Sequence, residues 1–112
     1  MSDHKIPSTE VGSRILFEND RVRVWDLRLA PGESTGVHAH HCDYFYVVIG
    51  DGELNAINPD GSTLHCGTMR DGDVHYRAID GEPAVHEAIN AGKQEWRNII
   101  VELKEKPAGP RT

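Results

Sequence analysis

The sequence has few cysteines, no long apolar run and no cluster of basic residues. Each absence argues against one class of protein: disulfide-rich, membrane-spanning and nucleic-acid-binding, respectively. Cys42 and Cys66 are the only cysteines and form no CxxC pair, so we expect a reduced protein with free thiols, while a disulfide between them stays open. The sequence shows no signal-like segment and no apolar run near the ~20 residues of a membrane span. These absences predict a cytoplasmic protein without membrane contact.

The charge balance is acidic, with 12 Lys and Arg residues against 18 Asp and Glu residues, and a net charge of -6 when His is neutral. Because an acidic surface repels phosphate backbones, nucleic acid is not an expected partner. The 112 residues suit one domain, which can bury roughly two-thirds of its unfolded surface. We predict polar, flexible tails at residues 1–12 and 105–112 around one folded domain at residues 13–104.

A long helical period is also absent, and short alternating or β-rich runs separated by turn sequences take its place. Clean alternation in RVRVWDLRL puts four residues on one face: Arg23, Trp25, Leu27 and Leu29. In WRNIIVELK the corresponding set is Trp96, Asn98, Ile100 and Glu102. ELNAINPDGSTLHC predicts a hairpin with its tip at residues 58–61. Short strands with turns about every 8–12 residues are typical of a sandwich or a barrel.

The stretch GVHAHHCDYFYVVIGDG, residues 36–52, holds three histidines within four positions. His38 and His40 are two residues apart, so in a strand both imidazoles face the same side with Cα atoms ~6.5 Å apart. Metal–nitrogen bonds of ~2.0–2.2 Å allow such a pair to converge on one ion. His41 faces the other side and is expected in solvent. A barrel can bring a third imidazole alongside, and His86 in VHEAIN is the candidate.

The predicted metal ligands are His38, His40, Asp43 and His86. Three imidazoles and a carboxylate suit a divalent transition metal such as Fe, Mn, Ni, Zn, Cu or Co, so ligand type does not select the metal. If strand parity continues from His40, Tyr44 faces the metal instead of Asp43, and either arrangement can leave a position open for water or substrate. No residue is assigned a catalytic role.

Several other side chains have a functional and a structural interpretation. Arg77 near a metal would hold a carboxylate bidentately, or it forms a surface ion pair. Three consecutive aromatic residues either line a pocket or, as we favour, belong to the core or an interface: Tyr44, Phe45 and Tyr46. We expect packing roles at a sheet or dimer contact for Trp25 and Trp96, and surface positions for His65 and His75.

The spacing of the histidines and glycines resembles the motifs of small single-domain cupins. Gly32, five further residues and then His38-Ala39-His40 match the first motif, which continues to an acid followed by six residues and Gly50. His86 and Asn90 match the end of the second motif, although its Pro-x-Gly part matches poorly. The phrases LAPGESTGVHAH, DGEL and NAG further resemble the cupin proteins named for β-alanine degradation, and the resemblance covers residues 13–104.

Two departures concern the acid of the first motif. Asp43 stands where the family has Glu, and only two residues separate it from His40, where the family has three or four. Asp is one methylene shorter than Glu, and the shorter spacing changes which side chain faces inward. These departures put the fourth ligand in doubt and leave the three histidines as the part of the motif that matches.

The resemblance implies an all-β fold, a double-stranded β-helix or jelly-roll barrel that binds a metal. We expect a metal-dependent enzyme acting on a small organic acid, with oxygenase, isomerase and lyase chemistry all open. The alternative is a non-catalytic cupin that binds or senses a small molecule in the same cavity. Resembling proteins use N-terminal strands to extend a partner's sheet, so SRILFE and RVRVW predict a homodimer.

Overall fold

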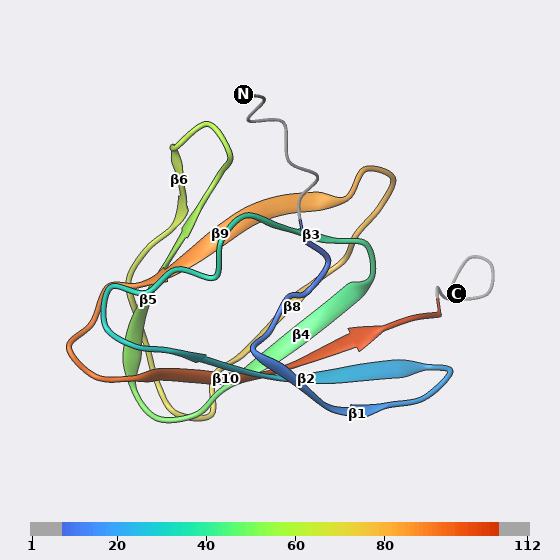
Figure 1. The fold of residues 1–112 in the computed structure, drawn as a ribbon, viewed down its shortest axis with the longest axis horizontal. Helices are drawn as coiled ribbons and strands as arrows, with labels where there is room; N and C mark the ends of the chain where they lie inside the picture. The colour runs from blue at the N-terminus through green and yellow to red at the C-terminus, as the bar shows by residue number, and fades with distance from the viewer. Residues whose placement is uncertain (1–7, 106–112) are drawn as a thin grey trace.

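The computed structural model describes residues 8–105 as strands, turns and loops, with no helix among them (Figure 1). This part of the chain therefore has no helix that could cross a membrane. The strands in chain order are β1 (Arg14–Glu18), β2 (Val22–Leu29), β3 (His38–His40), β4 (Asp43–Val48), β5 (Gly52–Ile57), β6 (Thr63–His65), β7 (Thr68–Met69), β8 (Val74–Arg77), β9 (Ala84–Asn90) and β10 (Trp96–Leu103). The all-β fold class predicted from the sequence is confirmed.

Two antiparallel sheets build the domain, and they lie across from each other in Figure 1. One sheet has the order β1-β2-β10-β4-β8, and the other has the order β3-β9-β5-β6, with β7 paired to β5. Strands from the two ends of the chain are neighbours: β2 pairs with β10 over its whole length, and β3 pairs with β9. This interleaving produces the double-stranded β-helix, and it brings distant segments of the sequence into one core.

The inward face of the first sheet follows the alternation in the sequence. In β10 every second residue is buried, beginning with Trp96, and in β2 the buried apolar residues are Trp25, Leu27 and Leu29. The two tryptophans lie inside the barrel with 5% and 1% of their surface exposed, so their packing role belongs to the core of this chain. The predicted hairpin also forms, with β5 paired to β6 and residues 58–61 between them.

Asp26 is buried although it lies on the opposite face of β2, which the alternation did not predict. The Nε atoms of Arg28 and Arg97 each donate a hydrogen bond of 2.9 Å to its carboxylate. A buried charge needs such partners, since an isolated carboxylate away from water is strongly destabilising. Arg28 on β2 and Arg97 on β10 therefore both cover Asp26 and balance its charge.

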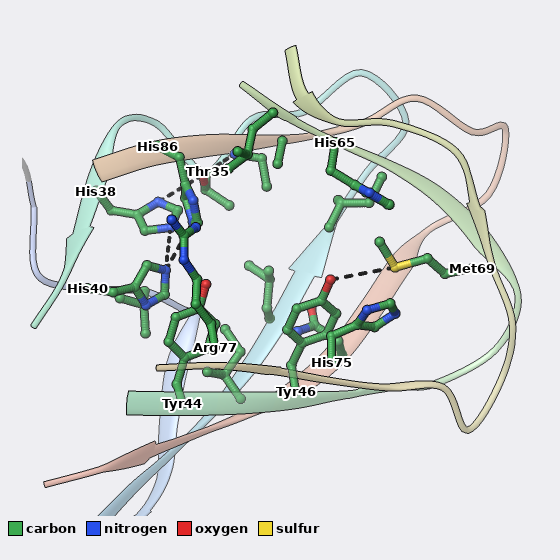
Figure 2. Close-up of a pocket in the computed structure, with 18 of the residues that line it drawn as sticks. Thr35, His38, His40, Tyr44, Tyr46, His65, Met69, His75, Arg77 and His86 are labelled. Carbon is green, nitrogen blue, oxygen red and sulfur yellow. Dashed lines mark hydrogen bonds between the residues drawn. The ribbon is translucent and has the colours of Figure 1, made fainter. Parts of the chain in front are cut away.

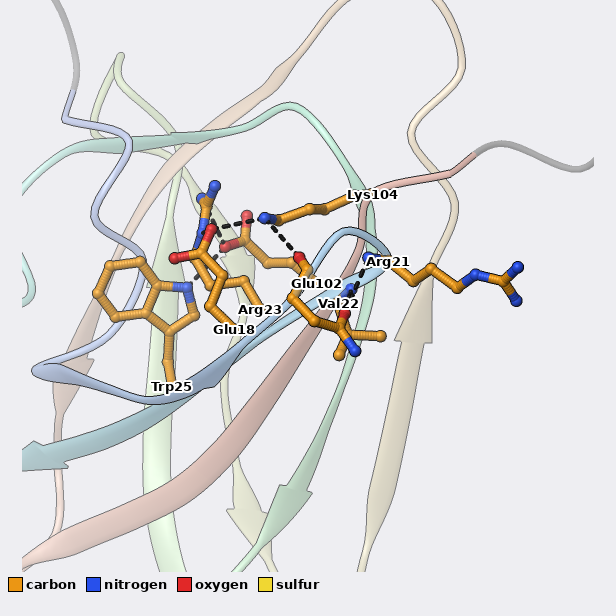
Figure 3. Close-up of polar contacts among 8 residues, drawn as sticks. Glu18, Arg21, Val22, Arg23, Trp25, Glu102 and Lys104 are labelled. Atoms are coloured by element: carbon orange, nitrogen blue, oxygen red, sulfur yellow. Dashed lines mark hydrogen bonds and ion pairs between the residues drawn. The ribbon is translucent and has the colours of Figure 1, made fainter.

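A second polar cluster holds β1, β2 and β10 together at one end (Figure 3). Glu102, only 3% exposed, accepts hydrogen bonds from Trp25 Nε1 at 2.6 Å and from Arg23 Nη1 at 3.2 Å. Glu18 on β1 accepts hydrogen bonds from Arg23 Nε at 3.0 Å and from Lys104 Nζ at 2.5 Å. The bonds to the buried Glu102 satisfy its charge, and the cluster fixes the edge strand β1 to the rest of the sheet.

The predicted tails are described only in part. Residues 1–7 and 106–112 lie outside the described residues. Within the predicted N-terminal tail, Val11 is 2% exposed in the core, and the Ser8 carbonyl accepts a hydrogen bond of 2.8 Å from the Ala39 amide. Part of the segment before residue 13 therefore packs beside β3, close to the histidines.

Candidate metal centre and its cavity

The structure brings three of the four predicted ligands together. His38 and His40 project from β3 toward the same side, and the β3–β9 register puts His86 directly opposite His38 (Figure 2). The Nε2 atom of His40 lies 3.1 Å from Nε2 of His38 and 3.1 Å from Nε2 of His86. All three side chains are buried, with 3%, 2% and 8% of their surface exposed in chain order. Their ligand atoms all lie within 4.8 Å of one another.

These distances fit a metal ion. For metal–nitrogen bonds of about 2.1 Å, a nitrogen–nitrogen separation of 3.1 Å corresponds to an angle of about 95° at the metal. The separations of His40 from His38 and from His86 both fit this angle, and three imidazole ligands leave other coordination positions for a carboxylate, water or substrate. The three histidines are thus positioned to hold a metal ion.

The ring of His38 is fixed by contacts behind it. Its Nδ1 lies 3.1 Å from the Gly36 carbonyl oxygen and 3.2 Å from Thr35 Oγ1. A carbonyl oxygen only accepts hydrogen bonds, so Nδ1 carries the proton and the lone pair of Nε2 faces the cluster in the neutral ring. The Nδ1 atoms of His40 and His86 are buried and have no hydrogen-bond partner among the described residues.

Burial keeps these imidazoles neutral. Removal from water lowers the pKa of His40 to about 2, with the neighbouring His38 and His86 adding to the effect. Burial, then His38 and Arg77, lower the pKa of His86 to about 4, and burial also lowers the pKa of His38. Neutral imidazoles are the form that binds metals, so near pH 7 no proton has to leave these nitrogens before a metal binds.

Asp43 is not part of the histidine cluster. Its buried carboxylate accepts a hydrogen bond of 2.8 Å from the Ile79 amide and one of 3.5 Å from the Tyr76 hydroxyl. Tyr44 instead follows the parity of His40, and its ring stacks on the His40 imidazole with centroids 4.0 Å apart. Asp43 as a ligand stays a prediction, but the placement of its carboxylate favours a structural role.

A cavity of about 250 Å³ adjoins the three histidines. Much of its wall is apolar, and the apolar lining includes Val11, Leu27, Leu54, Ala56, Met69, Ala88 and Ile100. Its polar lining includes Thr35, Tyr44, Tyr46, Arg77 and Asn98 as well as five histidines. No Asp or Glu is among the lining residues of the described chain, although the sequence as a whole is acidic. The described cavity wall therefore carries an arginine and five histidines but no carboxylate.

The cavity adds a role to several residues expected on the surface or in the core. His65 is exposed, as expected, and His75 is half-buried, and both line the cavity. Tyr44 belongs to the core, as we favoured, and Tyr46 packs against it, and both also line the cavity. Arg77 also lines it, where its positive charge acts against the raised pKa that burial gives Tyr44. The signal was present in VHYR, because His75 and Arg77 are two residues apart on one strand, the same spacing as His38 and His40.

Solved structures of known proteins share this fold. A cupin domain from Bordetella pertussis Tohama I superposes with a TM-score of 0.72 and 29% identity, covering 90% of this chain and 98% of that one. The chain has the cupin fold. An uncharacterized conserved protein with a double-stranded β-helix domain from Klebsiella pneumoniae agrees, with a TM-score of 0.62, 21% identity, and coverage of 92% and 85%.

Among curated proteins, this chain is 23% identical to auxin-binding protein T85 of Nicotiana tabacum over 101 residues, which is 88% of this chain. It spans about half, 54%, of the length of that relative. No family model matches the chain. The finer resemblance to cupins named for β-alanine degradation stays a prediction.

Proposed function

We propose that this cupin is a metal-dependent enzyme that acts on a small organic acid. The observation that carries the proposal is the combination of three converging imidazoles with an adjoining cavity that has an arginine and no acidic residue in its wall. A cavity without carboxylates does not repel an anionic ligand, and low-dielectric walls strengthen its attraction to a positive group.

The three imidazoles would hold the metal, and the chain supplies the surroundings that position a ligand beside it. A divalent transition metal bound there is a Lewis acid that polarises an oxygen group of the ligand. The contact between Gly36 and His38 keeps the ring of His38 in its orientation, and the stacked ring of Tyr44 does the same for His40. The apolar walls exclude water from the hydrocarbon part of the ligand.

Arg77 is the residue we assign to the carboxylate. Its register partner on β4 is Tyr44, which stacks on His40, so its backbone lies at the histidine end of the cavity. Figure 2 draws its side chain extending from the Tyr44 side toward the histidines, and its charge contributes to the lowered pKa of His40 and of His86, after burial and the neighbouring histidines. A guanidinium binds a carboxylate through two parallel hydrogen bonds, which fixes the orientation of the acid as well as its affinity.

The test combines metal analysis, ligand binding and turnover. Untagged protein should contain about one transition metal per chain, and small carboxylates should raise its melting temperature. Arg77→Met should weaken carboxylate binding by about tenfold, the effect of one charge-assisted contact at a partly exposed site. Arg70→Met is the matched control, since Arg70 is an exposed arginine outside the cavity lining. Carboxylates that bind equally well to the Arg77→Met protein would contradict the assignment.

The second candidate is a non-catalytic cupin that binds or senses a small molecule. The names of the curated relatives favour it, since both are auxin-binding proteins. The two candidates predict the same binding but differ in turnover. Consumption of a bound acid by metal-loaded protein, followed by nuclear magnetic resonance and by oxygen uptake, supports the enzyme, and tight binding with no change in the ligand supports the binder.

A further inference from the structure

A second polar group lies at the other end of the cavity from the three histidines. It consists of His65 on β6 and His75 on β8, whose ring centroids are 6.4 Å apart. Tyr46 lies beside them, with its ring stacked on His75 at 5.0 Å and its hydroxyl 3.6 Å from Met69 Sδ. Figure 2 shows the two ends facing each other across the cavity. We name His65 and His75 the distal pair.

The strand register gives the distance between the two ends. On β4 and β8, Tyr44 is paired with Arg77 and Tyr46 with His75. Two residues along a strand correspond to ~6–7 Å between Cα atoms, so the backbone of His75 lies about that far along β8 from the backbone of Arg77. The rest of the lining is mainly apolar. The cavity therefore has a polar group at each end and a mainly apolar wall elsewhere.

The distal pair has unused hydrogen-bonding capacity. His75 Nε2 is buried and has no hydrogen-bond partner among the described residues. Buried polar atoms are nearly always satisfied, by protein, water or a ligand. A second metal site is disfavoured, because in the described chain the only group of three metal-binding side chains is the one at the other end. Imidazoles without a neighbouring carboxylate suit an anionic oxygen group of a ligand.

We propose that the distal pair is a second anion subsite, and that the ligand of this cupin is a short dicarboxylate. One carboxylate lies at the three histidines and Arg77, the hydrocarbon chain lies against the apolar wall, and the second carboxylate accepts hydrogen bonds from His65 and His75. This inference rests on the proposed function, because it assumes that the first end binds a carboxylate.

The experiment measures affinity against ligand length. Metal-loaded protein is titrated calorimetrically with straight-chain dicarboxylates from succinate to suberate, and with the monocarboxylate of the same carbon number in each case. One dicarboxylate length should bind at least about tenfold more tightly than its monocarboxylate, with weaker binding at shorter and longer lengths.

Substitution of His65 and of His75 tests whether these two residues form the second carboxylate subsite. His75→Phe keeps a ring that can stack on Tyr46 and removes the ring nitrogens, and His65→Phe changes a more exposed residue, which guards against misfolding of the first variant. Each should reduce the dicarboxylate preference to less than about twofold and leave monocarboxylate affinity unchanged. His41→Phe, an exposed histidine outside the cavity lining, should behave as wild type.

The outcomes separate this inference from the proposed function. Monocarboxylates that bind while no dicarboxylate binds more tightly, or a preference that survives both substitutions, would overturn the distal subsite and leave the proposed function intact. Failure of every carboxylate to bind metal-loaded wild type would overturn both.

Discussion

Substitution of His86 tests whether the three histidines form one metal site. His86 comes from β9 and the other two imidazoles come from β3, so His86→Ala removes the ligand that joins the two strands. The Nδ1 atom of His86 is buried and has no hydrogen-bond partner in the described part of the chain, and the ring borders an existing cavity. We therefore expect the stability of the metal-free variant to stay within about 1 kcal/mol of wild type.

The effect on the metal-bound protein should be much larger. A ligand at 100 times its Kd stabilises the folded state by about 2.7 kcal/mol. For a domain of this size, each kcal/mol shifts the melting temperature by about 4–8 °C, so metal should raise it by roughly 10–20 °C. His86→Ala should lose most of this shift at the same metal concentration, because only two imidazoles remain to hold the ion.

The assay is differential scanning fluorimetry of protein stripped with a chelator and then reloaded with Zn, Ni, Mn or Fe(II), together with elemental analysis. His38→Ala and His40→Ala should behave like His86→Ala, and His41→Ala should retain the full shift, since His41 is exposed and outside the cluster. A His86→Ala protein with wild-type metal content and the same thermal shift would refute the assignment of these three side chains to one site.

Three further predictions concern Asp43, Asp26 and the edge strand β1. Asp43→Ala should lower the free energy of unfolding by about 1–3 kcal/mol, because the Ile79 amide loses the hydrogen bond to this carboxylate. The variant should keep a metal content near that of wild type. Loss of the metal would show instead that Asp43 is a ligand. Burial raises the pKa of Asp26, but hydrogen bonds from Arg28 and Arg97 outweigh burial and hold the pKa in the folded state below the ordinary value of 3.8. The ionised carboxylate therefore contributes its full stabilisation above the unfolded-state pKa, and this stabilisation is lost as the pH falls through the lower pKa of the folded state. In urea unfolding, the excess stability of wild type over Asp26→Asn should be constant at pH 6–8 and shrink below about pH 4; a difference unchanged at pH 2 contradicts this. The homodimer stays a prediction, based on β1 as an edge strand whose residues are all exposed, with 54% of the surface of Phe17 exposed. Light scattering should give twice the 12.5 kDa chain mass for wild type and a monomer mass for Phe17→Glu. A wild-type monomer at all concentrations would rule the dimer out.

Local patterns in the sequence were enough to predict the strands and which residues share a face of each strand. The alternation in β2 and β10 grouped the residues that share a face, because neighbouring side chains in any strand point to opposite sides, and the structure shows which of the two faces is the core. The same rule placed His38 and His40 on one side of β3, and it left Tyr44 as the alternative to Asp43 for the position that follows them; Tyr44 is the residue that stacks on His40. The hairpin tip at residues 58–61 follows from its turn residues alone.

The completion of the site depended on pairings that no local pattern contains. His40 and His86 are 46 residues apart and meet only because β3 pairs with β9 in one register. Asp43 was a plausible ligand by type, but the fold brings the Ile79 amide to its carboxylate. His65 and His75 read as isolated polar residues in the sequence, and the packing of two sheets turns both toward one cavity. Periodicity determines which face of a strand a residue occupies, whereas the residues that it meets there are determined by the pairing and packing of strands distant in the chain.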